Sequence, residues 1–398
     1  MTELTSQELN QQIDNLVEKI FPKLLKIRRH LHMYPELSHQ EVETTKRINE
    51  WLKENGITPL THSLKTGTAA EVFGKETGPI VAIRADIDAL PIQEESNLPF
   101  RSTIDGISHM CGHDVHTTIA LGAGIILQEL KNNLPGRVRL LFQPAEETEG
   151  GAISVIEAGL LDGVSSIIGL HNFPDLPVGT IGIKEGFLMA SVDDFTITIK
   201  GKGGHAAMPE RTIDPIVIGS AVISQLQTLV SRTISAKESA VLSIGSFQGG
   251  ATNNVIPDTA VLKGTVRTSN DSVRNSIYEQ FKKLVSNTVE AMGGEVDIDY
   301  KFLFPAVFND QQVTNVVRST AIRIVGEENT VVAEPTMGGE DFSYYQQKVP
   351  GCYVWLGSGN KEKRIVHPWH HPEFMVDEEA IKIGVKWMVQ SAVRLLEN

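Results

Sequence analysis

Two short segments of the sequence carry side chains that bind metal ions and move protons. Cys111 and His113 are two residues apart, a spacing at which one turn of the chain can direct a thiolate and an imidazole at the same cation. Glu146 and Glu147 are adjacent, so their carboxylates point in different directions. One of them can coordinate a metal while the other takes a proton from water, the division of labour that metal-dependent hydrolysis requires.

Other metal-binding side chains follow segments that we expect to be strands. His171 comes directly after the apolar run 166–170, and a histidine-rich segment, HPWHHP, spans residues 367–372. Taken alone, a histidine at a strand end is more often a hydrogen-bonded core residue than a ligand. In an open α/β sheet, however, ligands bind beyond the carboxyl ends of the strands, which is where these clusters fall. Their coincidence favours one common site.

A cysteine hydrolase is the competing interpretation, with Cys111 as nucleophile and His113 as its base. Such an enzyme needs neither two adjacent acids nor two further histidine-bearing segments. The number of nitrogen and oxygen donors therefore favours a metal centre.

The periodicity of apolar residues predicts an α/β domain with a mostly parallel sheet. Short β-branched runs at 80–84, 138–142, 166–170 and 353–357 read as buried strands, and helices are expected at 41–55, 117–130, 152–159, 313–325 and 378–396. Strands that alternate with helices imply a sheet covered on both faces. We expect this catalytic domain to comprise residues 1–184 and 303–398.

The intervening segment, 185–302, has a different pattern. Strands are expected at 192–200, 240–247, 259–268 and 295–302, and helices at 215–233 and 272–292. The order βαββαβ is that of the ferredoxin-like fold. The sequence thus predicts a small α+β domain inserted into the catalytic domain.

Composition narrows the possible partners and location. Lys and Arg total 36 against 49 Asp and Glu, and the resulting net charge of −13 disfavours nucleic acid and anionic membranes. Only two cysteines occur, and we find neither an export signal nor an apolar run long enough to cross a bilayer. We therefore expect a cytoplasmic protein.

A set of motifs spread over nearly the whole chain, from Arg28 to the last helix, resembles a known family. The motifs are RRHLHMYPELS (28–38), RADIDALP (84–91), HMCGHDVHT (109–117), QPAEE (143–147), GLHN (169–172), GKGGHAAMP (201–209), NVIPD (254–258) and GGEDF (338–342). Together they resemble the dinuclear metal aminoacylase and carboxypeptidase superfamily. Within it, they are most similar to the N-acyl-amino-acid amidohydrolases, which include hippurate hydrolases, N-acetyldiaminopimelate deacetylases and auxin-conjugate hydrolases.

The resemblance implies a role for each matching residue. Two divalent ions, Zn²⁺, Mn²⁺, Co²⁺ or Ni²⁺, would be held by Cys111, His113, Glu147, His171 and His370, with Cys111 as the bridging ligand and Glu146 as the general base. His370 is preferred over His371 because the family's C-terminal ligand precedes a proline by two positions, as His370 precedes Pro372.

The inserted domain resembles the family's lid and dimerisation domain. This implies a homodimer or a higher oligomer, in which His205 reaches an active site, often that of the neighbouring subunit, and stabilises the oxyanion. Asn254 and Arg267 are the candidates for binding the substrate carboxylate.

The implied reaction is hydrolysis of the amide bond of an N-acyl amino acid, such as an N-acetyl or N-benzoyl derivative, to a carboxylic acid and a free amino acid. Two alternatives are a dipeptidase or carboxypeptidase with the same metal chemistry, and a protein that binds acylated amino acids without cleaving them.

Overall fold

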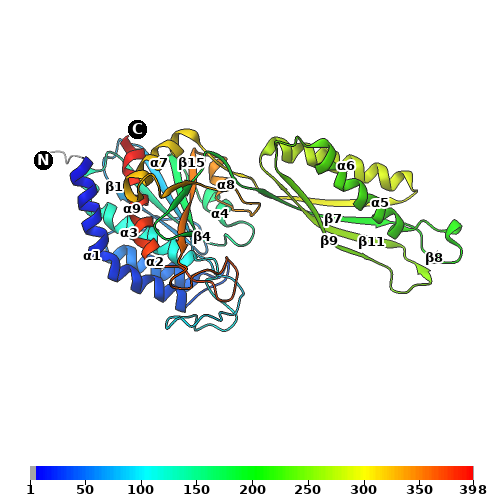
Figure 1. Cartoon of the computed structure of the whole chain (residues 1–398), viewed down its shortest axis with the longest axis horizontal. Coiled ribbons are helices and arrows are strands. Elements are labelled where there is room, and N and C mark those ends of the chain that lie inside the picture. Colours follow the sequence, from blue (N-terminus) through cyan, green and yellow to red (C-terminus); the bar gives the residue numbers. More distant parts are fainter. Residues whose placement is uncertain (1–5, 398) are drawn as a thin grey trace. The chain divides into compact units, whose positions relative to one another are not determined.

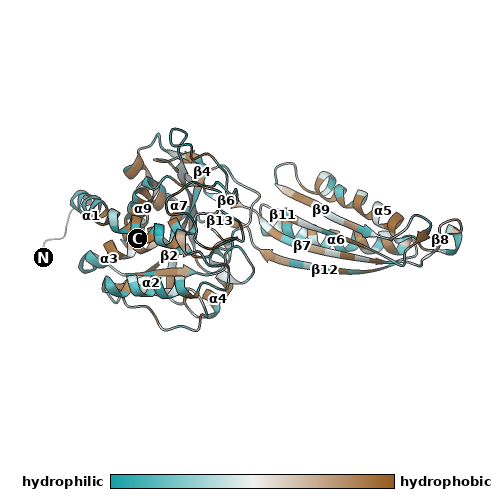
Figure 2. Cartoon of the chain, turned by 90° about the horizontal axis from the view of Figure 1, so that it is seen from below, coloured by the Kyte–Doolittle hydropathy of each residue, from teal (hydrophilic) through white to brown (hydrophobic). Residues whose placement is uncertain are grey.

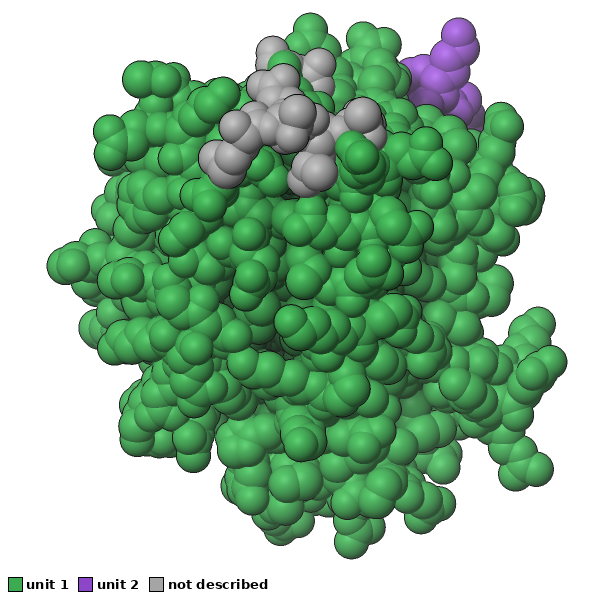
Figure 3. All heavy atoms as spheres, turned by 90° about the vertical axis from the view of Figure 1, so that its left-hand side faces the viewer, with its two compact units in different colours: residues 1–188, 308–334, 344–398 green, residues 189–307, 335–343 purple. Residues whose placement is uncertain are grey.

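The computed structural model describes residues 6–397 and divides the chain into two compact units (Figure 3). Unit 1 comprises residues 1–188, 308–334 and 344–398, and unit 2 comprises 189–307 and 335–343. Residues 1–5 and 398 lie outside the described residues. They are the two ends of the expected catalytic domain, and residues 1–5 also begin the segment that we searched for an export signal.

The boundaries of unit 2 at 189 and 307 lie four and five residues after those that we expected, and residues 335–343, which we expected in the catalytic domain, belong to unit 2. The chain passes between the units in two short paired strands, β6 (Gly186–Met189) and β13 (Val307–Asn309). Residues 335–343 join unit 2 because they pair with its first residues: the Ala190 amide donates to the Gly338 carbonyl oxygen over 3.0 Å. This pairing of distant segments leaves no periodic signal in the sequence.

A seven-stranded sheet with the strand order β1-β3-β2-β4-β15-β5-β14 forms the centre of unit 1 (Figure 1). The strands are β1 (Thr68–Phe73), β2 (Ile80–Asp86), β3 (Arg137–Gln143), β4 (Val164–Pro177), β5 (Ile181–Ile183), β14 (Thr330–Val332) and β15 (Gly351–Gly359). The four central strands, β3, β2, β4 and β15, are parallel, whereas β1 and β5 pair antiparallel with β3 and β15. Every residue of β2 and β15 is buried, as expected for strands covered on both faces.

The helices of unit 1 are α1 (Ser6–Met33), α2 (Val42–Glu54), α3 (His113–Glu129), α4 (Gly151–Glu157), α7 (Gln311–Val325) and α9 (Glu379–Glu397), with a short α8 (Ser343–Gln346) at the unit boundary and a 3₁₀ turn at Lys131–Asn133. Helices α3 and α9 pack on the strands β2 and β4 and against each other. Helix α1 packs on the two helices α3 and α9 (Figure 1). Gly384 permits this close approach, because a Cβ there would lie 2.5 Å from Cδ1 of Ile119. The buried α3 begins at the candidate ligand His113.

Unit 2 has the ferredoxin-like arrangement expected from its sequence. The strands β7 (Ser191–Lys200), β9 (Ala240–Gly249), β11 (Thr259–Thr268) and β12 (Glu295–Phe304) form an antiparallel sheet in the order β12-β7-β11-β9. The largely apolar α5 (Pro215–Thr228), visible in Figure 2, and α6 (Asp271–Ala291) pack on it. A π-helical turn (Leu229–Thr233), a 3₁₀ turn (Pro209–Arg211) and a small ribbon of β8 (Gly204–His205) and β10 (Val255–Ile256) complete the unit.

The fold class expected from the sequence is thus confirmed: an α/β domain with a mostly parallel sheet that carries an inserted α+β domain. Among residues 6–397, no helix is both long enough and apolar enough to span a membrane.

Candidate metal centre

The candidate ligands lie after β3, within β4, at the start of α3 and in the loop before α9. Because β4 extends past His171, the strand end expected there from the sequence is wrong. His113 is the first residue of α3, and Cys111 lies two residues before it, on the other side of the N-cap Gly112, whose φ of 86° suits glycine. Glu146 and Glu147 follow β3, and His171 lies in β4. His370 belongs to the loop before α9, and its backbone amide donates to the Met110 carbonyl oxygen over 2.8 Å. This bond fixes the C-terminal loop beside the segment that carries Cys111.

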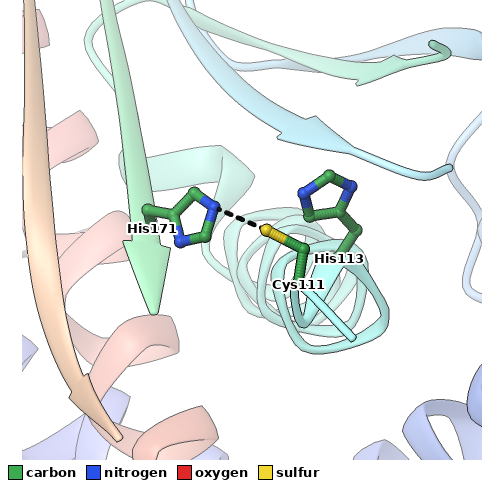
Figure 4. Close-up of side chains that lie close together, drawn as sticks. All are labelled: Cys111, His113 and His171. Carbon is green, nitrogen blue, oxygen red and sulfur yellow. Dashed lines mark hydrogen bonds between the residues drawn. The ribbon is translucent and has the colours of Figure 1, made fainter. Parts of the chain in front are cut away.

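Cys111 is shared by two groups of potential metal ligands. Its Sγ lies 3.4 Å from Nε2 of His171, and the two side chains point toward one another (Figure 4). The donor atoms of Cys111, His113 and His171 all lie within 4.8 Å of one another, and so do those of Cys111, Glu147 and His370. The structure therefore brings together all five ligands that we predicted from the sequence, in two groups with the thiol in common.

Glu146 lies beside these groups. Its Oε2 is 3.9 Å from Nε2 of His113, and Oε1 of Glu147 is 3.8 Å from the same nitrogen. Glu146 is buried, at 7% exposed, so its carboxylate is held close to the cluster and away from bulk water.

Two buried polar atoms of the candidate ligands have no hydrogen-bond partner: Nε2 of His113 and Oε1 of Glu147. Buried polar atoms are nearly always hydrogen-bonded, so each unpaired one requires an explanation. Thiolate, imidazole and carboxylate are the ligand types that Zn²⁺ and similar divalent ions take in proteins. The unpaired atoms and the donor set therefore fit cation binding.

The electrostatics of the cluster agree with this fit. Burial and the neighbouring carboxylates of Glu147 and Glu146 raise the pKa of the Cys111 thiol well above its ordinary value. Burial alone would lower the pKa of His113, but Asp86, Asp88 and Glu147 together raise it to about 10. Both shifts reflect negative charge gathered in a buried space, which a cation would neutralise.

Several residues that support the ligands were not identified from the sequence. Oδ1 of Asp88 lies 3.1 Å from Nδ1 of His113, and its Oδ2 accepts the Glu147 amide over 3.0 Å and the Ser38 hydroxyl over 2.7 Å. One carboxylate thus orients two candidate ligands, as residues behind metal ligands commonly do. The alternation of Asp86 and Asp88 just after a buried strand was the available signal, since it places both on one side of the chain.

His116, which belongs to the same histidine-rich segment, has both ring nitrogens occupied. Its Nδ1 lies 2.6 Å from Oδ1 of Asp86, and its Nε2 accepts the backbone amide of Asn172 over 2.9 Å. His116 therefore braces β4 beside His171 and is not available as a ligand in this arrangement.

His370 and His371 have different surroundings. Nε2 of His370 lies 3.4 Å from Oε1 of Glu147. The ring of His371 instead stacks on His367 at 4.2 Å between ring centroids, and its Nδ1 accepts the Glu373 amide over 3.1 Å. The geometry thus places His370, and not His371, beside the candidate ligand Glu147.

The sequence-predicted residues of unit 2 do not all lie together. His205 in β8 pairs with Val255 in β10, and the Ala206 amide donates to the carbonyl oxygen of Asn254, so His205 and Asn254 are neighbours on the ribbon. Arg267 lies near the far end of β11, opposite Val192 of β7. At roughly 3.3 Å per residue along a strand, about 25 Å of β11 separates Arg267 from the strand's first residue, Thr259.

Comparison with known proteins identifies the class to which this fold and site belong. Residues 82–394 match the model of peptidase family M20/M25/M40, and the chain belongs to this family. The resemblance found in the motifs is thereby confirmed.

Individual relatives match over almost the whole chain. An N-acetylcysteine deacetylase of Bacillus subtilis (strain 168) is 49% identical over 385 residues, which cover 96% of this chain and 100% of the relative. Thermostable carboxypeptidase 1 of Saccharolobus solfataricus is 36% identical over 382 residues, which cover 95% of this chain and 96% of the relative. The crystal structure of a Bacillus subtilis protein described as a dinuclear metal-binding peptidase of the M20 family superposes with a TM-score of 0.85 at 46% identity, covering 96% of this chain and 99% of that one.

Proposed function

We propose that this protein is a metal-dependent amidohydrolase that cleaves N-acyl amino acids to a carboxylic acid and a free amino acid. The observation that carries the proposal is the convergence of five ligand side chains on two groups that share Cys111, with the carboxylate of Glu146 beside them. The relative named N-acetylcysteine deacetylase, 49% identical, supports an N-acyl amino acid as the substrate.

Two divalent ions, Zn²⁺, Mn²⁺, Co²⁺ or Ni²⁺, would occupy the two groups. Cys111, His113 and His171 would hold one ion, and Cys111, Glu147 and His370 would hold the other, with the Cys111 thiolate common to both. When bound, such ions lower the pKa of water and polarise a carbonyl oxygen.

Glu146 is the general base in this proposal. Its carboxylate takes a proton from the attacking water and returns it to the nitrogen of the leaving amine, so that the amine departs neutral. Its burial beside His113 excludes competing bulk water from the carboxylate.

His205 is assigned to stabilising the oxyanion. Its Nδ1 accepts the Ala207 amide over 3.1 Å, so in the neutral ring the proton lies on the exposed Nε2. This is the tautomer required to donate a hydrogen bond to a substrate oxygen. Asn254, its neighbour on the ribbon, and Arg267 are proposed to bind the substrate carboxylate. Because about 25 Å of β11 separates Arg267 from the ribbon, the two side chains would have to come from different subunits to meet at one carboxylate.

We also propose that the protein is cytoplasmic and that it forms a homodimer. The dimer would form through unit 2. Strand β9 is an edge strand of the four-stranded sheet, and Val241 and Phe247 on it are exposed, as are Ile216 and Val217 on α5. An edge strand with apolar side chains is suited to pairing with a second copy.

A peptidase with the same metal chemistry is the second candidate, and the relative named thermostable carboxypeptidase 1 favours it. A protein that only binds acylated amino acids is less consistent with the site, because Glu146 and all five ligands are present.

The test is a substrate screen on the metal-loaded protein. Metal content is measured, the ions are removed with a chelator, and activity is assayed after readdition of Zn²⁺, Mn²⁺, Co²⁺ or Ni²⁺. We expect N-acetyl or N-benzoyl amino acids to be cleaved in a chelator-reversible manner, and faster than free dipeptides or peptides. Preferential cleavage of peptides would favour the peptidase, and binding without turnover under all metals would refute the proposed activity.

A further inference from the structure

The backbone turn that presents Glu146 is held by a residue outside the metal centre. Ala145, which immediately precedes Glu146, has a φ of 51°, a left-handed conformation that residues with a side chain rarely adopt. Such a conformation persists only where surrounding contacts enforce it. The turn directs Glu146 and Glu147 to different positions, so whatever enforces it also sets where the proposed base lies.

Two buried carboxylates accept the backbone amides on either side of Glu146. Oε1 of Glu41 accepts the Ala145 amide over 2.8 Å, and Oδ2 of Asp88 accepts the Glu147 amide over 3.0 Å. Glu41 and Asp88 are 0% and 1% exposed, so water does not compete for these bonds. Asp88 binds the residue after Glu146 and also contacts the candidate ligand His113, whereas Glu41 binds the residue before Glu146.

The side chain of Glu41 is not used by the helix that it precedes. It occupies the N-cap position of α2, yet its side chain makes no capping hydrogen bond. The carboxylate of Glu36 caps that helix instead, accepting the amides of Glu43 over 3.2 Å and Thr44 over 2.8 Å. The side chain of Glu41 is thus directed away from its own helix and toward Ala145.

The remaining sides of the turn are closed by glycines. A Cβ on Gly151 would lie 2.3 Å from the Pro144 carbonyl oxygen and 2.5 Å from that of Ala145, and a Cβ on Gly67 would lie 2.5 Å from Cδ of Pro144. The backbone therefore cannot shift readily in these directions, and its Ala145 amide faces Glu41.

We infer that Glu41 is a positioning residue for the general base: its buried carboxylate holds Ala145 in the left-handed conformation and thereby aligns Glu146 with the metal centre. This inference rests on the proposed function of Glu146. Glu41 acts through the backbone and neither touches the metals nor the substrate.

The test compares Glu41→Ala with Glu41→Gln and Glu41→Asp. Glu41→Ala removes the acceptor, and kcat should fall roughly 10- to 100-fold while KM stays within about threefold and the metal content is unchanged. Glu41→Gln keeps an acceptor oxygen and should retain most of kcat. Glu41→Asp keeps the charge but withdraws it by one methylene, so its kcat should be intermediate; it also serves if Glu41→Ala does not fold. Unchanged kcat in both Glu41→Ala and Glu41→Asp, or loss of metal, would overturn the inference.

A matched control and a double variant separate positioning from general damage. Glu36→Gln weakens a cap on the same helix and should leave kcat unchanged. In a Glu146→Gln background, Glu41→Ala should cause no further loss of the residual rate, because both changes act on the same step. A further tenfold loss would show that Glu41 acts elsewhere.

Hydrogen exchange gives a readout that does not depend on turnover. Peptides that contain the Ala145 amide should lose protection in Glu41→Ala and keep it in Glu41→Gln and Glu36→Gln. If the unaltered protein cleaves no N-acyl amino acid, the proposed function fails while exchange still decides whether Glu41 holds the turn; retained protection in Glu41→Ala would refute the positioning role.

Discussion

The metal-binding end of unit 1 and the β8–β10 ribbon of unit 2 both carry residues to which we assign chemistry, but they are built differently. Cys111, His113 and His171 are buried, and Asp88 and other polar side chains fix the segments that carry them. His205 and Asn254 are exposed, and backbone pairing of a two-residue ribbon holds them.

This difference separates stability from chemistry. In unit 1, buried charged groups depend on one another, so a substitution alters both folding and the site. On the ribbon, an exposed side chain can be removed at little cost to folding, so its loss reports on the reaction alone.

The largest effect is expected at Glu146. Glu146→Gln removes the group that accepts and returns the proton, and kcat should fall by about 10⁴-fold, at the upper end of general acid–base contributions. Both metal ions should remain, because Glu146 is not one of the proposed ligands. Metal content by elemental analysis and kcat on an N-acyl amino acid measure the two quantities. Loss of metal, or near-normal turnover, would show that the roles of Glu146 and Glu147 are wrongly divided.

A second test concerns a buried ion cluster next to the metal site. Oδ2 of Asp114 lies 2.9 Å from Nε of Arg28 and 2.9 Å from Nδ1 of His32, and Nε2 of His32 lies 3.2 Å from Oε1 of Glu94. All four side chains are buried. Asp114→Asn removes the carboxylate that Arg28 and His32 share, but Arg28 keeps Glu378 and His32 keeps Glu94 as acidic contacts. The substitution should therefore lower the free energy of unfolding by about 3 kcal/mol at pH 7, the lower end for a broken buried ion pair. Asp14→Asn, at a partly exposed pair with Lys386, should change it by less than about 1 kcal/mol.

The pH dependence of the Asp114 effect has a definite sign. Burial alone would raise the pKa of Asp114, but Arg28 and His32 hold it well below its ordinary value. A carboxyl whose pKa is depressed by folding stabilises the protein above its unfolded pKa, about 3.9, and loses this contribution as the pH falls further. The difference between the unaltered protein and Asp114→Asn should therefore shrink below about pH 4. Urea unfolding of the metal-free proteins at pH 7 and pH 3 tests this, and a constant difference would contradict it.

The sequence predicted most of the elements because their apolar residues repeat with helix or strand periodicity. The alternation in 192–200 predicted β7, and the family resemblance of the motifs implied the five ligands that converge in the structure. The strand β1, with its small alanines, and the three-residue strands β5 and β14 carry too little pattern to be recognised.

The support of the site could not be predicted in the same way. Glu41 lies 104 residues from Ala145, whose amide donates to it, and its position in the sequence indicated only the start of the helix expected at 41–55. Such contacts depend on the packing of distant segments, which no local pattern records. The separation of Arg267 from His205 likewise follows from the length of β11. We predicted this strand from the sequence, but we did not deduce from it that the two residues lie far apart.

His205→Ala should give a smaller loss of activity than Glu146→Gln and no loss of stability. Removal of one oxyanion donor costs roughly 10²- to 10³-fold in kcat, whereas truncation of an exposed side chain barely affects folding. Asn253→Ala, an exposed change beside the same ribbon, is the matched control and should leave kcat unaltered. Turnover within about threefold of the unaltered protein in His205→Ala would remove His205 from the reaction.

Mixing Glu146→Gln chains with His205→Ala chains sharpens the test. If His205 serves the neighbouring subunit, a mixed dimer contains one complete site and regains activity. If each site is completed within one subunit, a mixed dimer contains no complete site and activity is not regained.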